Sequence, residues 1–209
     1  MDELVHNYIQ NIHDLFLGTQ VTDLNSQTMD FRLGIREATD LIISSNSKGK
    51  KVIFIGNGGS AAVANHKALD FWFTGKVRGV SFSDDALLTC VSNDFGYSHV
   101  FARPINMFAD AGDVLVAISS SGNSENIVLA TEEARRCGCH IITFSGFEPT
   151  NRLRKVGNLN FHVASKHFNK VESTHLLICD CILEQIVFYR NQFITTNERN
   201  GGGPLNNLV

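Results

Sequence analysis

The chain has 209 residues, of which 43% are hydrophobic and 19% are charged, a balance typical of a folded globular protein. Its 18 Lys and Arg residues against 21 Asp and Glu residues give a net charge of −3, and without a basic stripe we expect no nucleic-acid partner. No apolar run approaches the roughly 20 residues that cross a bilayer, and the first residues are acidic, which predicts neither a membrane helix nor a signal peptide. The odd number of cysteines, five, favours a reduced, cytoplasmic protein.

Two helices are expected before the first strand. Apolar residues recur at helical spacing from residue 3 to about residue 17, which predicts an amphipathic helix. A second helix is predicted over about residues 23–46. We therefore assign residues 1–48 to an N-terminal helical arm that serves in oligomerisation, because such arms commonly pack on a neighbouring subunit. Packing of the arm on its own domain is the alternative.

The pattern then changes to short apolar runs that alternate with helical segments. Strands are predicted over residues 51–55, 113–118 and 140–145, with further strands over 86–92 and 160–164. Helices are predicted over about 60–73, up to about 136, and over 171–189, which is the most apolar of them. Such alternation predicts an α/β domain over residues 49–190, with a three-layer, mostly parallel, flavodoxin-like sheet flanked by helices. The polar, Gly-rich residues 191–209 are expected to form a loose tail.

Two loops follow predicted strands and open predicted helices. Residues 56–60 read Gly-Asn-Gly-Gly-Ser, and residues 119–124 read Ser-Ser-Ser-Gly-Asn-Ser. Ligands of open parallel sheets bind at the carboxyl ends of strands, and helix N-termini attract anions, so both loops predict phosphate binding. The alternative is a pair of tight turns with serine N-caps. Neither loop matches a P-loop or a dinucleotide fingerprint, so we expect no nucleotide cofactor.

Three motifs resemble those of the sugar isomerase (SIS) domain family, and most closely its phosphoheptose isomerases. They are GNGGS at residues 56–60, SNDFGY at residues 92–97 and GDVLVAISSSGNS at residues 112–124. The resemblance runs from about residue 50 to residue 190. It implies a homotetramer with sites between subunits, bound zinc in some members, and interconversion of sedoheptulose 7-phosphate and glycero-manno-heptose 7-phosphate for surface polysaccharide or lipopolysaccharide.

The resemblance also implies a set of residues that bind the substrate and its phosphate: Asn57, Gly58, Gly59, Ser60, Asn93, Asp94, Ser119, Ser120, Ser121 and Ser124. The family's chemistry rests on a His and a Glu four residues apart on one helix, and on a Gln and a His eight apart on a later helix. This chain departs from that pattern. It has His66 and Asp70 on the first helix, and Glu172 and Asp180 on the second.

An aldose–ketose isomerase needs a base that moves a proton between adjacent carbons, and an acid or electrophile at the carbonyl oxygen. His66 and Asp70 share a helix face at i and i+4, as do Glu172 and His175 at i and i+3. We predict Asp70, His175 and Glu172 to be catalytic, with Asp70 and His175 as the acid/base pair. A surface hydrogen bond between His66 and Asp70 is the alternative.

The same side chains also have the donor chemistry of a metal site. His66, Asp70, Glu172 and Asp180 offer the imidazole and carboxylate ligands that zinc and related ions accept, so we predict them as the metal ligands.

A non-catalytic member of the same family is the rival to the isomerase. It would bind a sugar phosphate or a protein partner, and the Asp at position 180 favours it because the family's replication-initiator regulator also lacks that His. A dinucleotide-dependent enzyme is disfavoured by the missing fingerprint.

Overall fold

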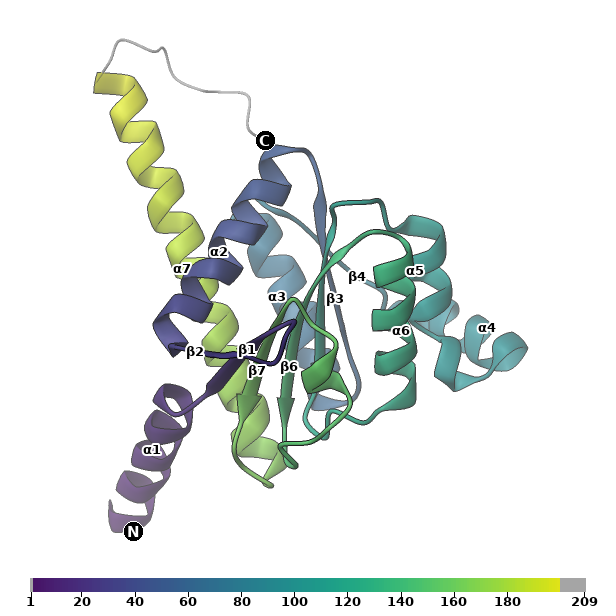
Figure 1. The fold of residues 1–209 in the computed structure, drawn as a ribbon, viewed down its shortest axis with the longest axis horizontal. Coiled ribbons are helices and arrows are strands. Elements are labelled where there is room, and N and C mark those ends of the chain that lie inside the picture. Colours follow the sequence, from purple (N-terminus) through teal and green to yellow (C-terminus); the bar gives the residue numbers. More distant parts are fainter. Residues whose placement is uncertain (1, 200–209) are drawn as a thin grey trace.

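The structure, a computed structural model, describes residues 2–199, and the side chains as far as residue 192. A seven-stranded sheet crosses the domain in the order β2-β1-β7-β6-β5-β3-β4 (Figure 1). Its strands are β1 (Gln20–Asp23), β2 (Thr28–Met29), β3 (Lys51–Gly56), β4 (Arg78–Ser81), β5 (Val114–Ser119), β6 (His140–Gly146) and β7 (Leu159–Val163). β1 runs antiparallel to β2 and β7, and the remaining pairs are parallel.

Helices cover both faces of the sheet and make a three-layer α/β fold, as predicted. One face carries α2 (Phe31–Ser47), α3 (Gly59–Phe73) and α7 (Phe168–Arg199), and the other carries α4 (Asp85–Phe95), α5 (Ala102–Phe108) and α6 (Glu125–Arg136). Strand β3 shows the alternation that builds two cores. Its Val52 and Phe54 join the first cluster, whereas Ile53 and Ile55 join the second. Helix α1 (Asp2–Leu17) has no fully buried residue and contacts α7.

The N-terminal region differs from the prediction. The helix expected over residues 23–46 begins only at Phe31, because the Asp30 side chain accepts hydrogen bonds from the Arg32 and Leu33 amides and caps it. The residues before it form the β1–β2 hairpin, and β1 pairs with β7. Residues 20–47 are therefore part of the sheet and its core, and only α1 has the character of an arm (Figure 1).

Two further segments correct the prediction. Residues 86–92, predicted as a strand, lie in α4, whose first turn is capped by the Asp84 side chain. Helix α7 continues to Arg199, so residues 191–199 of the expected loose tail are helical, and its remainder lies outside the described residues. Strand β4 was not predicted. The other strands and α3 and α6 confirm the prediction to within a few residues.

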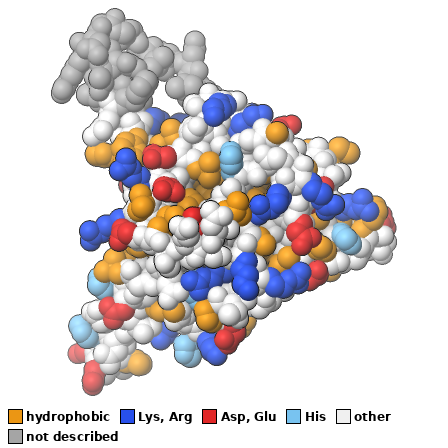
Figure 2. All heavy atoms as spheres, viewed as in Figure 1, with side chains coloured by type: hydrophobic (Ala, Val, Ile, Leu, Met, Phe, Trp, Pro, Cys, Tyr) orange, Lys and Arg blue, Asp and Glu red, His pale blue; other side chains and the backbone are white. Residues whose placement is uncertain are grey.

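Within residues 2–199, none of the helices combines the length and the apolar composition needed to traverse a bilayer. Figure 2 shows acidic and basic side chains interspersed over the face viewed, with hydrophobic side chains between them.

Candidate active site

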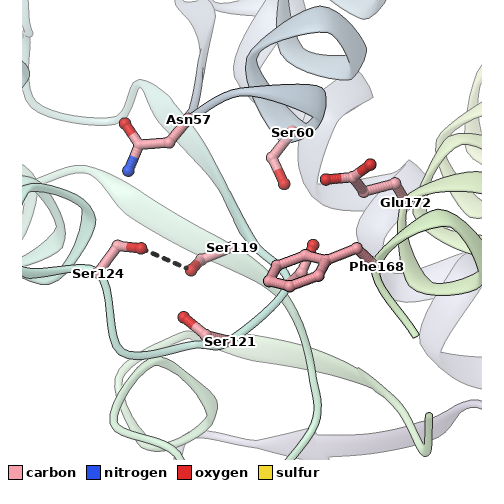
Figure 3. A pocket seen from close by; sticks show the side chains of 8 residues that line it. Asn57, Ser60, Ser119, Ser121, Ser124, Phe168 and Glu172 are labelled. Atoms are coloured by element: carbon pink, nitrogen blue, oxygen red, sulfur yellow. Dashed lines mark hydrogen bonds between the residues drawn. The ribbon is translucent and has the colours of Figure 1, made fainter. Parts of the chain in front are cut away.

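The two predicted loops meet at one edge of the sheet. Strands β3 and β5 are parallel neighbours, with Gly56 opposite Ile118, so the loops that follow them lie side by side. These two loops and the start of α7 form the walls of a pocket that is open to solvent. It is lined by Asn57, Ser60, Ser119, Ser120, Ser121, Ser124, Phe168 and Glu172 (Figure 3). Six of the ten predicted substrate-binding residues are in this lining, and Phe168 was not predicted.

Two helix N-termini open at this pocket. Neither α3 nor α6 has a side-chain cap on its first backbone amides. The α3 cap position is Gly58, with φ of +54° and ψ of −123°, a backbone conformation that L side chains rarely adopt. Uncapped amides and helix dipoles of this kind favour an anion.

Residues 119–124, which we call the serine loop, bring hydroxyl groups to the pocket beside these amides. Ser119 Oγ accepts a hydrogen bond from the Gly122 amide at 3.2 Å and donates to Ser124 Oγ at 3.3 Å. Ser121 Oγ accepts from the Asn123 amide at 3.2 Å. Figure 3 shows the hydroxyls of Ser119, Ser121 and Ser124 turned toward a common space.

Ser120 places a further hydroxyl in the pocket lining. It is 4% exposed, and its Oγ makes no hydrogen bond within the loop. The Glu172 carboxylate is its neighbour across the lining. Buried hydroxyls are normally satisfied by a polar partner, and an oxygen of a bound ligand would serve as one here.

Glu172 brings a carboxylate from α7 to the rim of the same pocket. Figure 3 shows it directed toward Ser60. A Cβ at Gly59 would lie 2.3 Å from Glu172 Oε2, so the glycine makes room for this carboxylate. Burial raises the pKa of Glu172 above its ordinary value, and hydrogen bonding by the neighbouring Ser120 hydroxyl acts in the opposite direction. A carboxyl group tuned toward neutrality in a pocket suits proton transfer.

Asn57 links three parts of the chain beside the pocket. It exchanges two amide hydrogen bonds of 2.9 Å with Asn126 of α6, and its Oδ1 also accepts from the Tyr97 hydroxyl at 3.0 Å. Asn93 and Asp94, predicted to line the pocket, are exposed on α4 outside its lining and hydrogen-bond to each other at 2.8 Å. From the SNDFGY motif, Tyr97 is the residue that reaches the loop. The position of Tyr97 within the SNDFGY motif could have identified it from the sequence, whereas no sequence motif marks Asn126.

A second cluster joins α3 to α7. Lys67, 1% exposed, contacts Asp70 Oδ2 at 2.5 Å and also pairs with Asp180 Oδ1. His66 Nε2 lies 3.3 Å from Asp70 Oδ2. Burial lowers the pKa of the Lys67 ammonium, but the hydrogen bonds to Asp180 and Asp70 outweigh burial and raise that pKa above its ordinary value. Sequence reasoning paired Asp70 with His66 and missed Lys67.

The four predicted zinc ligands do not converge within one chain. Asp70 and Asp180 contact Lys67, while Glu172 points into the serine pocket (Figure 3). Among the side chains that the structure describes, as far as residue 192, no three of His, Cys, Asp or Glu gather closely enough to hold a metal ion. The donor set of one chain, as folded here, therefore does not fit zinc.

His175, predicted as half of an acid/base pair with Asp70, is fully buried and does not line the pocket. Its Nε2 donates to the Ser145 carbonyl at 3.1 Å, its ring packs edge-on to Phe144, and its Nδ1 has no partner. Burial lowers the pKa of His175 to about 4. Residues three apart on a helix differ by about 60° in direction. Glu172 therefore faces the loops while His175 faces the sheet.

Comparison with known proteins agrees with this geometry. The family model described as the SIS domain matches residues 19–146. A phosphoheptose isomerase of Cytophaga hutchinsonii is 42% identical over 71% of this chain and 81% of its own length. Another, from Akkermansia muciniphila, is 33% identical over 89% of this chain and 98% of its own. The solved structure of a phosphoheptose isomerase from Neisseria gonorrhoeae is 30% identical, with a TM-score of 0.68 over 73% of this chain and 84% of that one. The match to the family model and these identities together show that the chain belongs to the SIS-domain family.

Proposed function

We propose that this chain is a sugar-phosphate isomerase that interconverts sedoheptulose 7-phosphate and glycero-manno-heptose 7-phosphate, in the synthesis of surface-polysaccharide heptose. The observation that carries the proposal is the serine-lined pocket at which two uncapped helices begin, with the buried Ser120 hydroxyl in its lining. The names of the relatives supply the reaction, and the pocket supplies a matching anion site. All five cysteines are unpaired, which suits the reducing cytoplasm.

The reaction moves one proton between the carbonyl carbon and the adjacent hydroxyl-bearing carbon, moves a second proton between the two attached oxygens, and passes through an enediol. In our proposal the serine loop and the α3 and α6 amides hold the phosphate. The Glu172 carboxylate takes the proton from one carbon and returns it to the next. The Ser60 hydroxyl, which faces Glu172 across the pocket (Figure 3), donates to the carbonyl oxygen as negative charge develops there. As the new carbonyl forms, the Ser60 oxygen recovers a proton from the neighbouring hydroxyl of the enediol, so each turnover leaves the protein unchanged in protonation.

The direct test is incubation of the purified protein with sedoheptulose 7-phosphate in deuterated water, followed by NMR and mass spectrometry. We expect the heptose phosphate product, and deuterium at the carbon next to the carbonyl. Binding of the sugar phosphate with neither product nor deuterium would overturn the isomerase and favour the non-catalytic rival.

Ser120→Ala removes a buried hydroxyl of the pocket lining. We expect KM for the sugar phosphate to rise roughly ten- to hundredfold, because a hydrogen bond to a charged group contributes about 1.5–3 kcal/mol. Steady-state kinetics give the value, and Ser44→Ala, at an exposed position of α2, is the matched control. An unchanged KM would place the phosphate elsewhere.

The proposed active form is a homo-oligomer, and by resemblance a tetramer. Large apolar side chains are exposed on α3 next to the Asp70 cluster: Leu69, Trp72 at 58% and Phe73 at 67%. Helix α1 exposes several more, among them Leu4 and Ile9. A second copy of the chain that covers these residues would also enclose His66 and Asp70, which is consistent with a site completed between subunits.

Trp72→Glu is expected to dissociate the oligomer, with a loss of affinity of at least about a hundredfold, because burial of an unpaired carboxylate costs several kcal/mol. Light scattering coupled to size-exclusion chromatography measures the mass. Met107→Glu places the same charge on α5, on the opposite layer of the fold, and should leave the mass unchanged. A monomeric unmodified protein would contradict the proposal.

A further inference from the structure

We propose that the Lys67 ammonium is the resident cation of the Asp70–Asp180 cluster, and that it excludes zinc from these two carboxylates. The two carboxylates come from helices α3 and α7 and meet on one Nζ atom. This inference concerns the surroundings of the proposed isomerase site and rests on that function only for its significance to the reaction.

The burial of Lys67 shows that this contact is built into the fold. Its side chain is 2% exposed, and a lysine is almost never so buried unless it is paired. Asp70 and Asp180 remain 26% and 43% exposed at their side chains. The ammonium therefore sits on the inner side of the cluster, and the carboxylates lie between it and the surface.

A zinc ion would compete directly with this arrangement. An ion bound to the same carboxylate oxygens would lie within a few ångström of Nζ, where two positive charges repel strongly. The oxygens also have their charge compensated already, because each aspartate receives a hydrogen bond from the ammonium. His66 contributes one more ligand atom beside Asp70 but cannot offset the repulsion.

As a consequence, the positive charge that neutralises the carboxylates between α3 and α7 is supplied by the Lys67 side chain and not by a bound metal ion. Lys67 is then a positioning residue, which holds two carboxylates of neighbouring helices at fixed places. Removal of its charge would leave two carboxylates without a counter-charge and one adjacent imidazole, which are ligand types that zinc accepts.

The experiment measures zinc on four forms of the full chain: the unmodified protein, Lys67→Arg, Lys67→Met, and Lys67→Met combined with Asp180→Asn. Each is stripped with a chelator and equilibrated with buffered Zn²⁺. Metal content is read by mass spectrometry, and affinity by competition with a chromophoric chelator. We expect Lys67→Met to bind zinc at least about tenfold more tightly than the unmodified protein and Lys67→Arg, because the ammonium no longer repels the ion. The added Asp180→Asn should abolish that gain.

The proposal is overturned if the unmodified protein binds zinc stoichiometrically and Asp70→Asn or Asp180→Asn abolishes that binding. This measurement is informative even if Lys67→Met does not fold. A folded Lys67→Met protein without a gain in zinc would overturn it as well. No arm measures isomerase activity, so failure of the proposed reaction and failure of this inference are separate results.

Discussion

Glu172→Gln is expected to lower kcat for sugar-phosphate isomerisation by about 10²–10⁴-fold, because an amide cannot accept the proton that a positioned base removes. KM should change only a few-fold, since the serine loop that holds the phosphate is intact. Steady-state kinetics and the rate of deuterium uptake into substrate both measure the effect. In the unmodified enzyme the acidic limb of the kcat profile should lie above the range of an ordinary Glu, because burial raises the pKa of Glu172.

Two variants accompany this test. Glu37→Gln changes an exposed carboxylate on α2 and should leave kcat unchanged. Gly59→Ala adds a methyl group 2.3 Å from Glu172 Oε2, which must swing aside. It should lower kcat without loss of thermal stability, because the displaced atom is the end of a flexible side chain. Full activity in Glu172→Gln would mean that Glu172 is not the base. Asp70 or Asp180 would then be the candidate for that role, and Asp70→Asn would be the variant that decides.

The second large effect is a loss of stability in mild acid. Burial lowers the pKa values of His162 and His175 to about 4, against an ordinary value of 6.5. Between these two values only the unfolded chain takes up the protons, so the free energy of unfolding falls as the pH drops from about 6.5 toward 4, and is unaffected above that window. At pH 5 the loss is about 2 kcal/mol for each imidazole.

Urea unfolding at pH 7.5 and pH 5.0 measures this loss. Carboxylates also titrate in the window, so the informative quantity is the difference between the unmodified protein and His175→Gln, which should lose about 2 kcal/mol less on acidification. His140→Gln removes an exposed imidazole of β6 and should behave as the unmodified protein. Equal acid sensitivity of all three proteins would show that His175 carries no such penalty.

The sheet was predictable where the chain alternates buried strands and helices. Strands β3, β5 and β6 are continuous apolar runs that end at turn residues. The β1–β2 hairpin was missed because strands of four and two residues, partly polar, carry almost no periodic signal. Helix α4 was mistaken for a strand because its apolar run is short, and composition alone does not separate the two. The decisive signal there is the cap at Asp84.

Parts of the candidate site could likewise be predicted from the sequence, and other parts could not. The position of the two pocket loops was predictable because each follows a strand directly, so local sequence fixes where the loop lies. The α3–α7 cluster was not, because a lysine in a helix is usually at the surface, and the burial of Lys67 depends on Asp180, 113 residues away. His175 was expected to share a cavity with Glu172 but is buried outside the pocket lining. Helical spacing fixes its direction relative to Glu172, but not which of the two faces the sheet.

The eight residues that line the described pocket include no lysine or arginine. The anion binding that we propose there would rely on dipoles and directional donors instead of full counter-charges, so ionic strength should have little influence on affinity. Donors fixed on two loops also select for tetrahedral geometry over net charge, which separates a phosphate monoester from a carboxylate. A product held in this way leaves without breaking an ion pair, an advantage for an enzyme whose substrate and product carry the same charge.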